Sequence, residues 1–148
     1  MTYLKAVVGV SVLGLVVLPL GADAVNAVTG GKATTSGCRV VSVTDGDTVR
    51  MYCPGRGIES ARLKGFDAPE KYSPGCTSEL ARAVAATWAL RWMLWQAERV
   101  SLVRTGTDRY GRALVFMALD DVPVARRMIA AGHARAYDGG HRAGWCSV

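Results

Sequence analysis

The sequence predicts an α+β fold that is mainly β: a five-stranded antiparallel β-barrel of the OB type with two or three attached helices. Short segments rich in valine and other strand formers, bounded by glycine or proline, occur before residue 66 and again between residues 100 and 119. The apolar period becomes helical from Thr77 to Glu98 and again from Val124 to Ala131. A chain of 148 residues without a visible internal repeat fits one such domain.

The first 24 residues are typical of a secretory signal. Lys5 precedes an apolar run from Ala6 to Leu20, and Ala22-Asp23-Ala24 follows as a cleavage motif. The run is shorter than the roughly 20 apolar residues of a spanning helix. We therefore expect cleavage after Ala24, or after Ala27, and a secreted or periplasmic domain. The alternative is a domain that an uncleaved segment 1–24 anchors to the membrane.

The part of the chain after the predicted signal has a net positive charge. Residues 25–37 are small and polar with a glycine pair, which predicts a flexible leader, and residues 38–148 form the predicted domain. The net charge of +6 is unchanged by the loss of residues 1–24, because Lys5 and Asp23 leave together. A small basic domain favours polyanionic partners, and no obligate protein partner is predicted.

Three strand segments are expected first, at residues 38–44, 48–53 and 58–66. Asp45-Gly46 between the first two is typical of a tight hairpin turn. Residues 67–76 contain two prolines and a glycine, which predicts an irregular loop.

A helix follows over residues 77–98, with an apolar stripe that we expect to face the core rather than to stack bases. The stripe consists of Leu80, Val84, Trp88, Trp92 and Trp95. Strands are expected again at 100–103 and 113–119, and a short helix at 124–131 ends at Gly132.

The four cysteines contain no C-x-x-C spacing, so a zinc site is poorly supported and two disulfides are expected in an exported chain. Cys38 and Cys53 lie almost symmetrically about the predicted hairpin turn, which favours their pairing. Cys76 and Cys146 would then tie the end of the chain to its middle. The sequence alone does not decide among the three possible connectivities.

Five charged residues fall at strand ends or in adjoining loops, where the mouth of a barrel gathers side chains. Each has an ordinary explanation as a turn or surface residue. Together they form a set with its own chemistry: three carboxylates and two guanidinium groups, from Asp47, Asp67, Glu70, Arg62 and Arg112.

Carboxylate oxygens with a backbone carbonyl suit a hard cation such as Ca²⁺ or Mg²⁺. His133 and His141 have no partner at ligand spacing and are expected at the surface. A guanidinium offers a planar fork for two phosphate oxygens. A cation, a carboxylate base and two arginines are the groups needed to hydrolyse a phosphodiester.

Three motifs, DGDTV at 45–49, RLKGFDAPE at 62–70 and DRYGR at 108–112, resemble the staphylococcal-nuclease-like (thermonuclease) family. Their order and spacing agree with the family from about residue 40 to about residue 137. The resemblance implies an OB barrel with attached helices. It also implies a Ca²⁺-dependent enzyme that cleaves DNA and RNA with little sequence preference and leaves 3′-phosphate ends.

The resemblance also implies a role for each matching residue. The carboxylates of Asp47 and Asp67 and the main-chain carbonyl of Ala68 would bind Ca²⁺, with Asp45 next to these ligands. Glu70 would hold the attacking water, and Arg62 and Arg112 would bind the phosphate. Two tyrosines would contact the nucleotide: Tyr110 beside its phosphate or sugar, and Tyr137 as the nearest candidate for a base-stacking residue.

The chain departs from the family pattern in two places. Position 68 is alanine where the best-known members carry threonine, and the chain ends soon after Tyr137, so the family's C-terminal helix is missing or much shortened. The alternative function is a catalytically silent OB module that binds nucleic acid or another polyanion. Such relatives lose one of the five charged residues, and none is lost here. A third possibility, a cell-envelope domain, would leave the acidic cluster unexplained.

Overall fold

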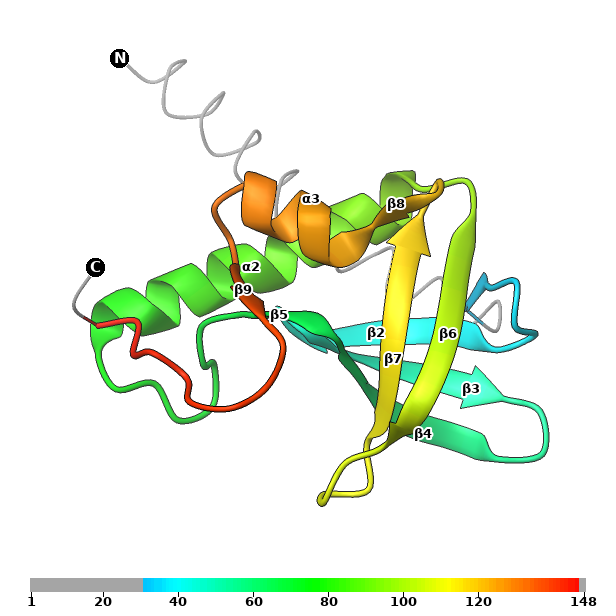
Figure 1. Ribbon diagram of the computed structural model, residues 1–148. Helices are drawn as coiled ribbons and strands as arrows, with labels where there is room; N and C mark the ends of the chain where they lie inside the picture. The colour runs from blue at the N-terminus through cyan, green and yellow to red at the C-terminus, as the bar shows by residue number, and fades with distance from the viewer. Residues whose placement is uncertain (1–30, 147–148) are drawn as a thin grey trace, which may run out of the picture.

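The structure, a computed structural model, describes residues 31–146, so the predicted signal segment 1–24 lies outside the described residues. Its main element is a curled sheet in the strand order β1-β2-β3-β4-β7-β6, with β8 paired to β7. Helices α2 (Thr77–Gln96) and α3 (Val124–Ala130) lie next to each other over one end of the sheet (Figure 1). The predicted fold class, mainly β with an OB-type sheet and attached helices, is confirmed.

The strands are short, and their buried residues form a single core. In β3, Val49, Met51 and Cys53 are buried and alternate with exposed residues, as expected for a strand with one face on the core. All neighbouring strands are antiparallel except β4 and β7, which run parallel. The strands are β1 Lys32–Ala33, β2 Arg39–Asp45, β3 Thr48–Cys53, β4 Gly57–Leu63, β5 Gly65–Asp67, β6 Val100–Thr107, β7 Ala113–Leu119, β8 Val122–Pro123 and β9 Arg135–Tyr137.

The β2–β3 turn lies one residue later than predicted. Asp45 pairs with Thr48, so the two turn residues are Gly46 and Asp47. A Cβ atom on Gly46 would lie 2.8 Å from the Cβ atoms of both Ala68 and Ala86, so only glycine lets the turn approach the helix this closely. Because Asp47 belongs to the turn, the direction of its side chain is not set by the alternation of inward and outward residues along a strand.

The segment predicted as one strand, 58–66, is two strands. The chain bends at Lys64 and Gly65, where Gly65 has a φ of 93°, and β5 leaves the main sheet to pair with β9. No strand was predicted at β9, because three residues carry too little periodicity to be recognised. The bend places Asp67 at the end of β5. At the other end of the domain, Lys32 and Ala33 of the predicted leader form β1, which pairs with β2.

The orientation predicted for α2 is wrong. Trp92 and Trp95 are 42% and 46% exposed, and Leu80 and Val84 on the same stripe are also exposed. The face turned to the barrel is instead made of smaller or shorter residues: Ala83, Ala86, Thr87, Leu90 and Leu94. Small side chains let the helix approach the Gly46 turn, and indole rings could not fit there. Among residues 31–146, no helix is long and apolar enough to span a membrane.

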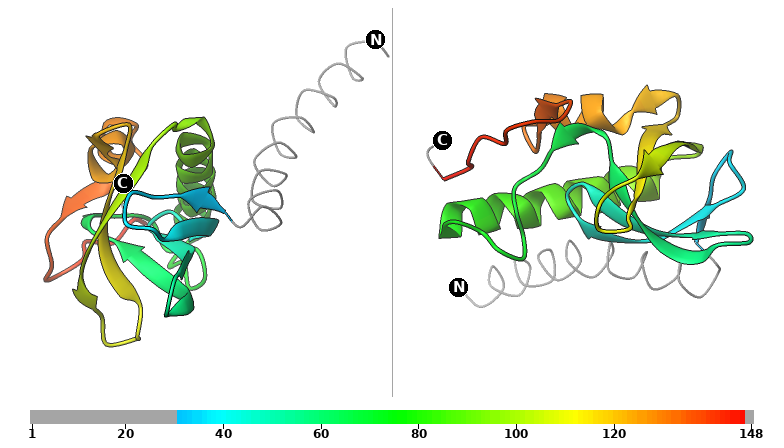
Figure 2. Two further views of the ribbon diagram at one scale, coloured as in Figure 1. Left: turned by 90° about the vertical axis from the view of Figure 1, so that its right-hand side faces the viewer. Right: turned by 60° about the horizontal axis from the view of Figure 1, so that its bottom comes forward.

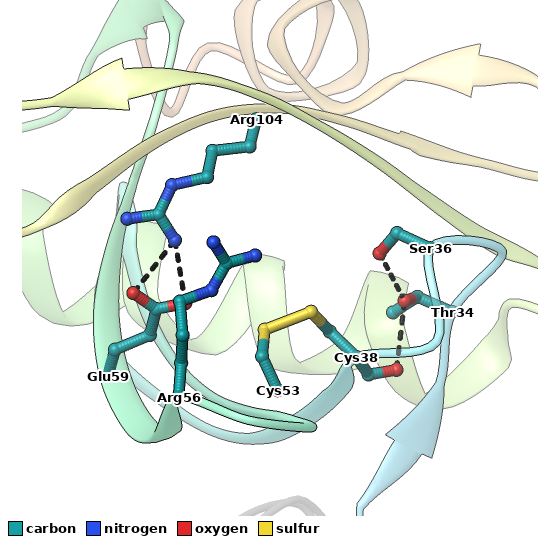
Figure 3. Close-up of a disulfide and its surroundings, with 7 residues drawn as sticks. All are labelled: Thr34, Ser36, Cys38, Cys53, Arg56, Glu59 and Arg104. Atoms are coloured by element: carbon teal, nitrogen blue, oxygen red, sulfur yellow. Dashed lines mark hydrogen bonds and ion pairs between the residues drawn. A yellow bond between two sulfur atoms is a disulfide. The ribbon is translucent and has the colours of Figure 1, made fainter.

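The structure contains both predicted disulfides, Cys38–Cys53 and Cys76–Cys146. The first joins the start of β2 to the end of β3, at the far end of the hairpin from the Gly46 turn (Figure 3). The second brings the C-terminal segment beside the start of α2, as both Figure 1 and Figure 2 show.

Candidate functional site

One pocket with a volume of about 890 Å³ collects the residues that the sequence singled out. They come from the β2–β3 turn, from β4, from the loop after β5, from the β6–β7 hairpin and from the C-terminal segment. The predicted residues that line it are Asp45, Asp47, Arg62, Ala68, Glu70, Tyr110, Arg112 and Tyr137. Asp67 is buried next to them and bonded to Arg62.

A buried ion-pair network forms the floor of this pocket. Arg62 Nη1 contacts Asp47 Oδ2, and Arg62 Nη2 lies 3.4 Å from Asp67 Oδ1, so one guanidinium joins the two acids. Fewer than a tenth of the surface of each of these three residues is exposed. Arg62 reaches both acids because β4 pairs with β3 at Thr48 and then bends into β5.

Asp47 has further partners that fix its carboxylate. Thr48 Oγ1 donates to Oδ1 at 3.0 Å, and the backbone N–H of Ala68 donates to Oδ2 at 3.3 Å. Burial nevertheless raises the pKa of Asp47 to about 7, against the opposing effect of Arg62. A second cation beside this carboxylate would favour its charged form.

Asp45 shapes the turn rather than the floor. Its Oδ1 accepts a hydrogen bond from the backbone N–H of Asp47 at 3.2 Å. This is the local side-chain bond that aspartate commonly makes to the residue two positions on. Asp45 thus orients the peptide that carries Asp47.

Glu70 is exposed in the loop before α2, and Glu79 on α2 holds that loop in place. The backbone N–H groups of Glu70 and Gly75 donate to the two oxygens of Glu79 at 3.2 and 2.7 Å. The Glu70 carboxylate itself accepts a hydrogen bond from the Tyr72 N–H at 3.1 Å. Glu79 was missed as a site residue, although it lies four positions before Ala83 on the buried face of the helix.

Arg112 is anchored by a residue of its own hairpin. Its Nε donates to Asp108 Oδ2 at 2.7 Å, and its backbone N–H donates to Asp108 Oδ1 at 2.9 Å. The side chain is partly exposed, and its guanidinium lies 5.6 Å from the centre of the Tyr110 ring. Tyr110 is exposed at the rim of the pocket.

The C-terminal segment contributes three groups. The Tyr137 hydroxyl donates to the Gly140 carbonyl at 2.9 Å. Arg142 Nε lies 3.1 Å from Asp67 Oδ1, and Trp145 Nε1 donates to Asp67 Oδ2 at 3.3 Å. Arg142 and Trp145 were not predicted as site residues. A glycine-rich tail has no periodicity that shows where it packs, and its place beside the pocket depends on the disulfide at its end.

The donor set suits a hard divalent cation. Two carboxylates, of Asp47 and Asp67, meet at one guanidinium, and the backbone N–H of Ala68 donates to Asp47. Oxygen donors of this kind are those that Ca²⁺ and Mg²⁺ prefer. The two carboxylates fit a hard cation of this kind, and Asp47 and Asp67, together with the main-chain carbonyl of Ala68, are the groups that could hold it.

The curled sheet with two attached helices is of the OB type, and one pocket brings its acids and arginines together. A sequence model described as a staphylococcal nuclease homologue matches residues 60–143, more than half of the chain. The chain belongs to this family, which confirms the resemblance drawn from its motifs.

Individual relatives agree. An uncharacterized endonuclease of Haemophilus influenzae is 33% identical over 100 residues, which cover 68% of this chain and 52% of the relative. A thermonuclease of Staphylococcus intermedius is 31% identical over 97 residues, covering 66% and 57%. A thermonuclease of Staphylococcus hyicus is 29% identical over 98 residues, with the same coverage of 66% and 57%. The chain thus spans little more than half the length of these relatives.

Proposed function

We propose that this protein is an exported Ca²⁺-dependent nuclease that hydrolyses phosphodiester bonds of DNA, RNA or both, with little sequence preference. The observation that carries the proposal is the buried Asp47–Arg62–Asp67 network, which shares one pocket with Glu70 and Arg112. The charge of +6 favours a polyanionic substrate. Contacts to backbone phosphates explain a weak preference for sequence.

The floor of the pocket would hold the cation and one side of the phosphate. Asp47, Asp67 and the Ala68 carbonyl are its proposed ligands, and a bound Ca²⁺ would neutralise charge on the phosphoryl oxygens. With the two carboxylates neutralised in this way, the Arg62 fork becomes available to two phosphate oxygens.

The rim supplies the remaining groups. Glu70 accepts a proton from the water that attacks phosphorus, or orients that water. The P–O5′ bond breaks, the departing O5′ takes a proton from solvent water, and the phosphate stays on the 3′ oxygen. Arg112, held by Asp108, faces the pocket and stabilises the charge of the five-coordinate transition state. Tyr110 would lie beside the phosphate or sugar.

The alternative is a catalytically silent OB module that binds nucleic acid. It requires only the basic surface and has no use for two buried acids beside Glu70. The full chain, produced under oxidising conditions, should be incubated with single-stranded DNA in Ca²⁺ and in a chelator. Cleavage that requires Ca²⁺ supports the enzyme, and DNA that is retarded on a gel but left intact supports the module.

Glu70→Gln sharpens this test. We expect turnover to fall by about 10²–10⁴-fold, because the variant loses the base but keeps the floor and both arginines. Binding, measured by fluorescence anisotropy of labelled DNA, should be retained. Glu59→Gln, the same change at the far end of the barrel, is the control. An unaltered rate for Glu70→Gln would remove Glu70 from the mechanism.

A further inference from the structure

The C-terminal segment returns to the floor of the pocket and bonds directly to a proposed cation ligand. The Trp145 indole N–H donates to Asp67 Oδ2 at 3.3 Å, and Arg142 Nε lies 3.1 Å from Asp67 Oδ1. Trp145 is only 7% exposed, although the residues before it in the glycine-rich tail are exposed. Both oxygens of Asp67 therefore have partners from this segment.

Trp145 is held by contacts to its backbone, its ring and its neighbours in the chain. The Cys76–Cys146 disulfide ties the residue after it to the start of α2. Arg82 Nη1 donates to the Trp145 carbonyl at 3.1 Å. The Arg135 guanidinium lies 3.8 Å from the centre of a Trp145 ring, and Arg135 Nη1 donates to the Gly144 carbonyl at 3.0 Å. The indole thus reaches Asp67 from a fixed position.

The disulfide is a tether and not a metal site. Cys76, Cys146 and Glu79 lie close enough together to hold an ion, but the two sulfur atoms are bonded to each other. Only a thiolate binds a metal well. What the bridge does is hold Trp145 against Asp67.

Asp67 needs such support more than Asp47 does. Asp47 lies in a hairpin turn and accepts bonds from Thr48 and from the Ala68 backbone. Asp67 ends the three-residue strand β5, which lies outside the main sheet, and its carboxylate contacts Arg62, Arg142 and Trp145. A donor fixed on one oxygen of a ligating carboxylate sets the direction of the other.

We propose that Trp145 is a positioning residue of the cation site and acts through Asp67. The Cys76–Cys146 bridge supports that site because it holds the Trp145 indole next to Asp67. This proposal rests on the proposed function, since it assumes that Asp67 binds a divalent cation. Arg142 acts on the same carboxylate in the opposite sense, because its charge competes with the cation.

The test is Ca²⁺ binding by the full-length chain, measured by titration calorimetry without nucleic acid. Trp145→Phe keeps an aromatic ring and removes the N–H, and we expect about tenfold weaker binding, the usual effect of losing a partner of a ligand. Arg142→Gln should bind Ca²⁺ more tightly than the wild type, because a competing positive charge is gone. General destabilisation of the tail would not give opposite signs.

Matched variants separate the tether from general effects. Trp92→Phe, on the exposed face of α2, should leave the affinity unchanged. Cys76→Ser with Cys146→Ser should weaken binding at least as much as Trp145→Phe, and Cys38→Ser with Cys53→Ser should not. The cysteine pairs also decide the matter if circular dichroism shows Trp145→Phe to be unfolded.

Two negative results have different meanings. Equal affinities of the wild type, a folded Trp145→Phe and the Cys76/Cys146 double variant would overturn the role of the tail and leave the proposed function intact. A wild-type chain that binds neither Ca²⁺ nor another divalent ion would overturn both proposals.

Discussion

Charged residues have different roles near the two ends of the β2–β3 hairpin. At the far end the Cys38–Cys53 disulfide closes the strands, and Arg104 Nη1 lies 2.8 Å from both oxygens of Glu59 (Figure 3). At the near end no covalent bond closes the turn, and Asp47 is buried against Arg62 and the backbone of Ala68.

The difference separates stability from function. At the far end one acid, Glu59, faces two arginines at the edge of solvent, Arg104 at 2.8 Å and Arg56 at 3.7 Å, and ion pairs of this kind contribute little. The near end buries two acids on one arginine, an arrangement that costs solvation and is weak evidence for stability. Charge that does not stabilise the fold is available to a ligand, and for this reason we propose the near end as the site.

The largest effect is expected at the near end. Arg62→Lys should lower kcat/KM by about 10³-fold, because a point charge cannot contact both acids and then two phosphate oxygens as the planar fork does. Steady-state cleavage of labelled single-stranded DNA measures this, with Arg104→Lys at the far end as the control. A wild-type rate for Arg62→Lys would show that the two ends do not differ as proposed.

The next largest effect is expected at the far end, and on stability alone. Replacing Cys38 and Cys53 by serine should lower the free energy of unfolding by about 3 kcal/mol, the chain-entropy value for a loop of about 15 residues. Denaturant unfolding measures the change. The cleavage rate of the folded variant should stay close to the wild type, and a rate that fell with stability would contradict the separation.

The third largest effect is expected on turnover at the near end, from a change in the loop that carries Glu70. In Glu79→Gln, one of the two backbone N–H groups that donate to Glu79 would face an amide NH₂ instead of an oxygen. We expect kcat to fall by about 10- to 100-fold, since a displaced catalytic group costs that much. Single-turnover rates at saturating DNA measure it, with Glu98→Gln, in the exposed segment after α2, as the control. If only KM changed, Glu79 would act on binding and not on Glu70.

The smallest effect concerns the ion pair of the far end. Arg104→Gln should change the free energy of unfolding by less than about 1 kcal/mol, because the Arg104 side chain is 30% exposed and water replaces much of the lost interaction. Thermal unfolding at low and high salt measures it. A loss as large as that of the disulfide would show that charge also stabilises the far end.

Much of the fold could be predicted, because strand and helix periods were clear where the segments were long. β3, β7 and the start of α2 lie where they were expected. The predictions that failed, the position of the β2–β3 turn and the buried face of α2, depend on close packing between segments and not on a local sequence pattern. A Cβ atom on Gly46 would clash with Ala86, so the turn needs glycine at this position, and α2 carries alanine where it meets the turn. Trp92 and Trp95 of the predicted stripe lie on the exposed face instead.

The candidate site divides in the same way. Asp47, Arg62 and Asp67 were found because they stand in motifs whose spacing is fixed by the turn and by the strand that follows. Glu79, Arg142 and Trp145 were not found, because they belong to none of the three motifs and their partners are set only by the folded structure.

The sequence by itself therefore determined the kind of barrel, the family and the charged residues of the mouth, since these depend on short-range pattern and side-chain chemistry. Only the tertiary structure decided which face of α2 is buried, which acid meets which arginine, and that the tail returns to Asp67. Those are contacts across many residues, and packing distances that no local periodicity encodes select them.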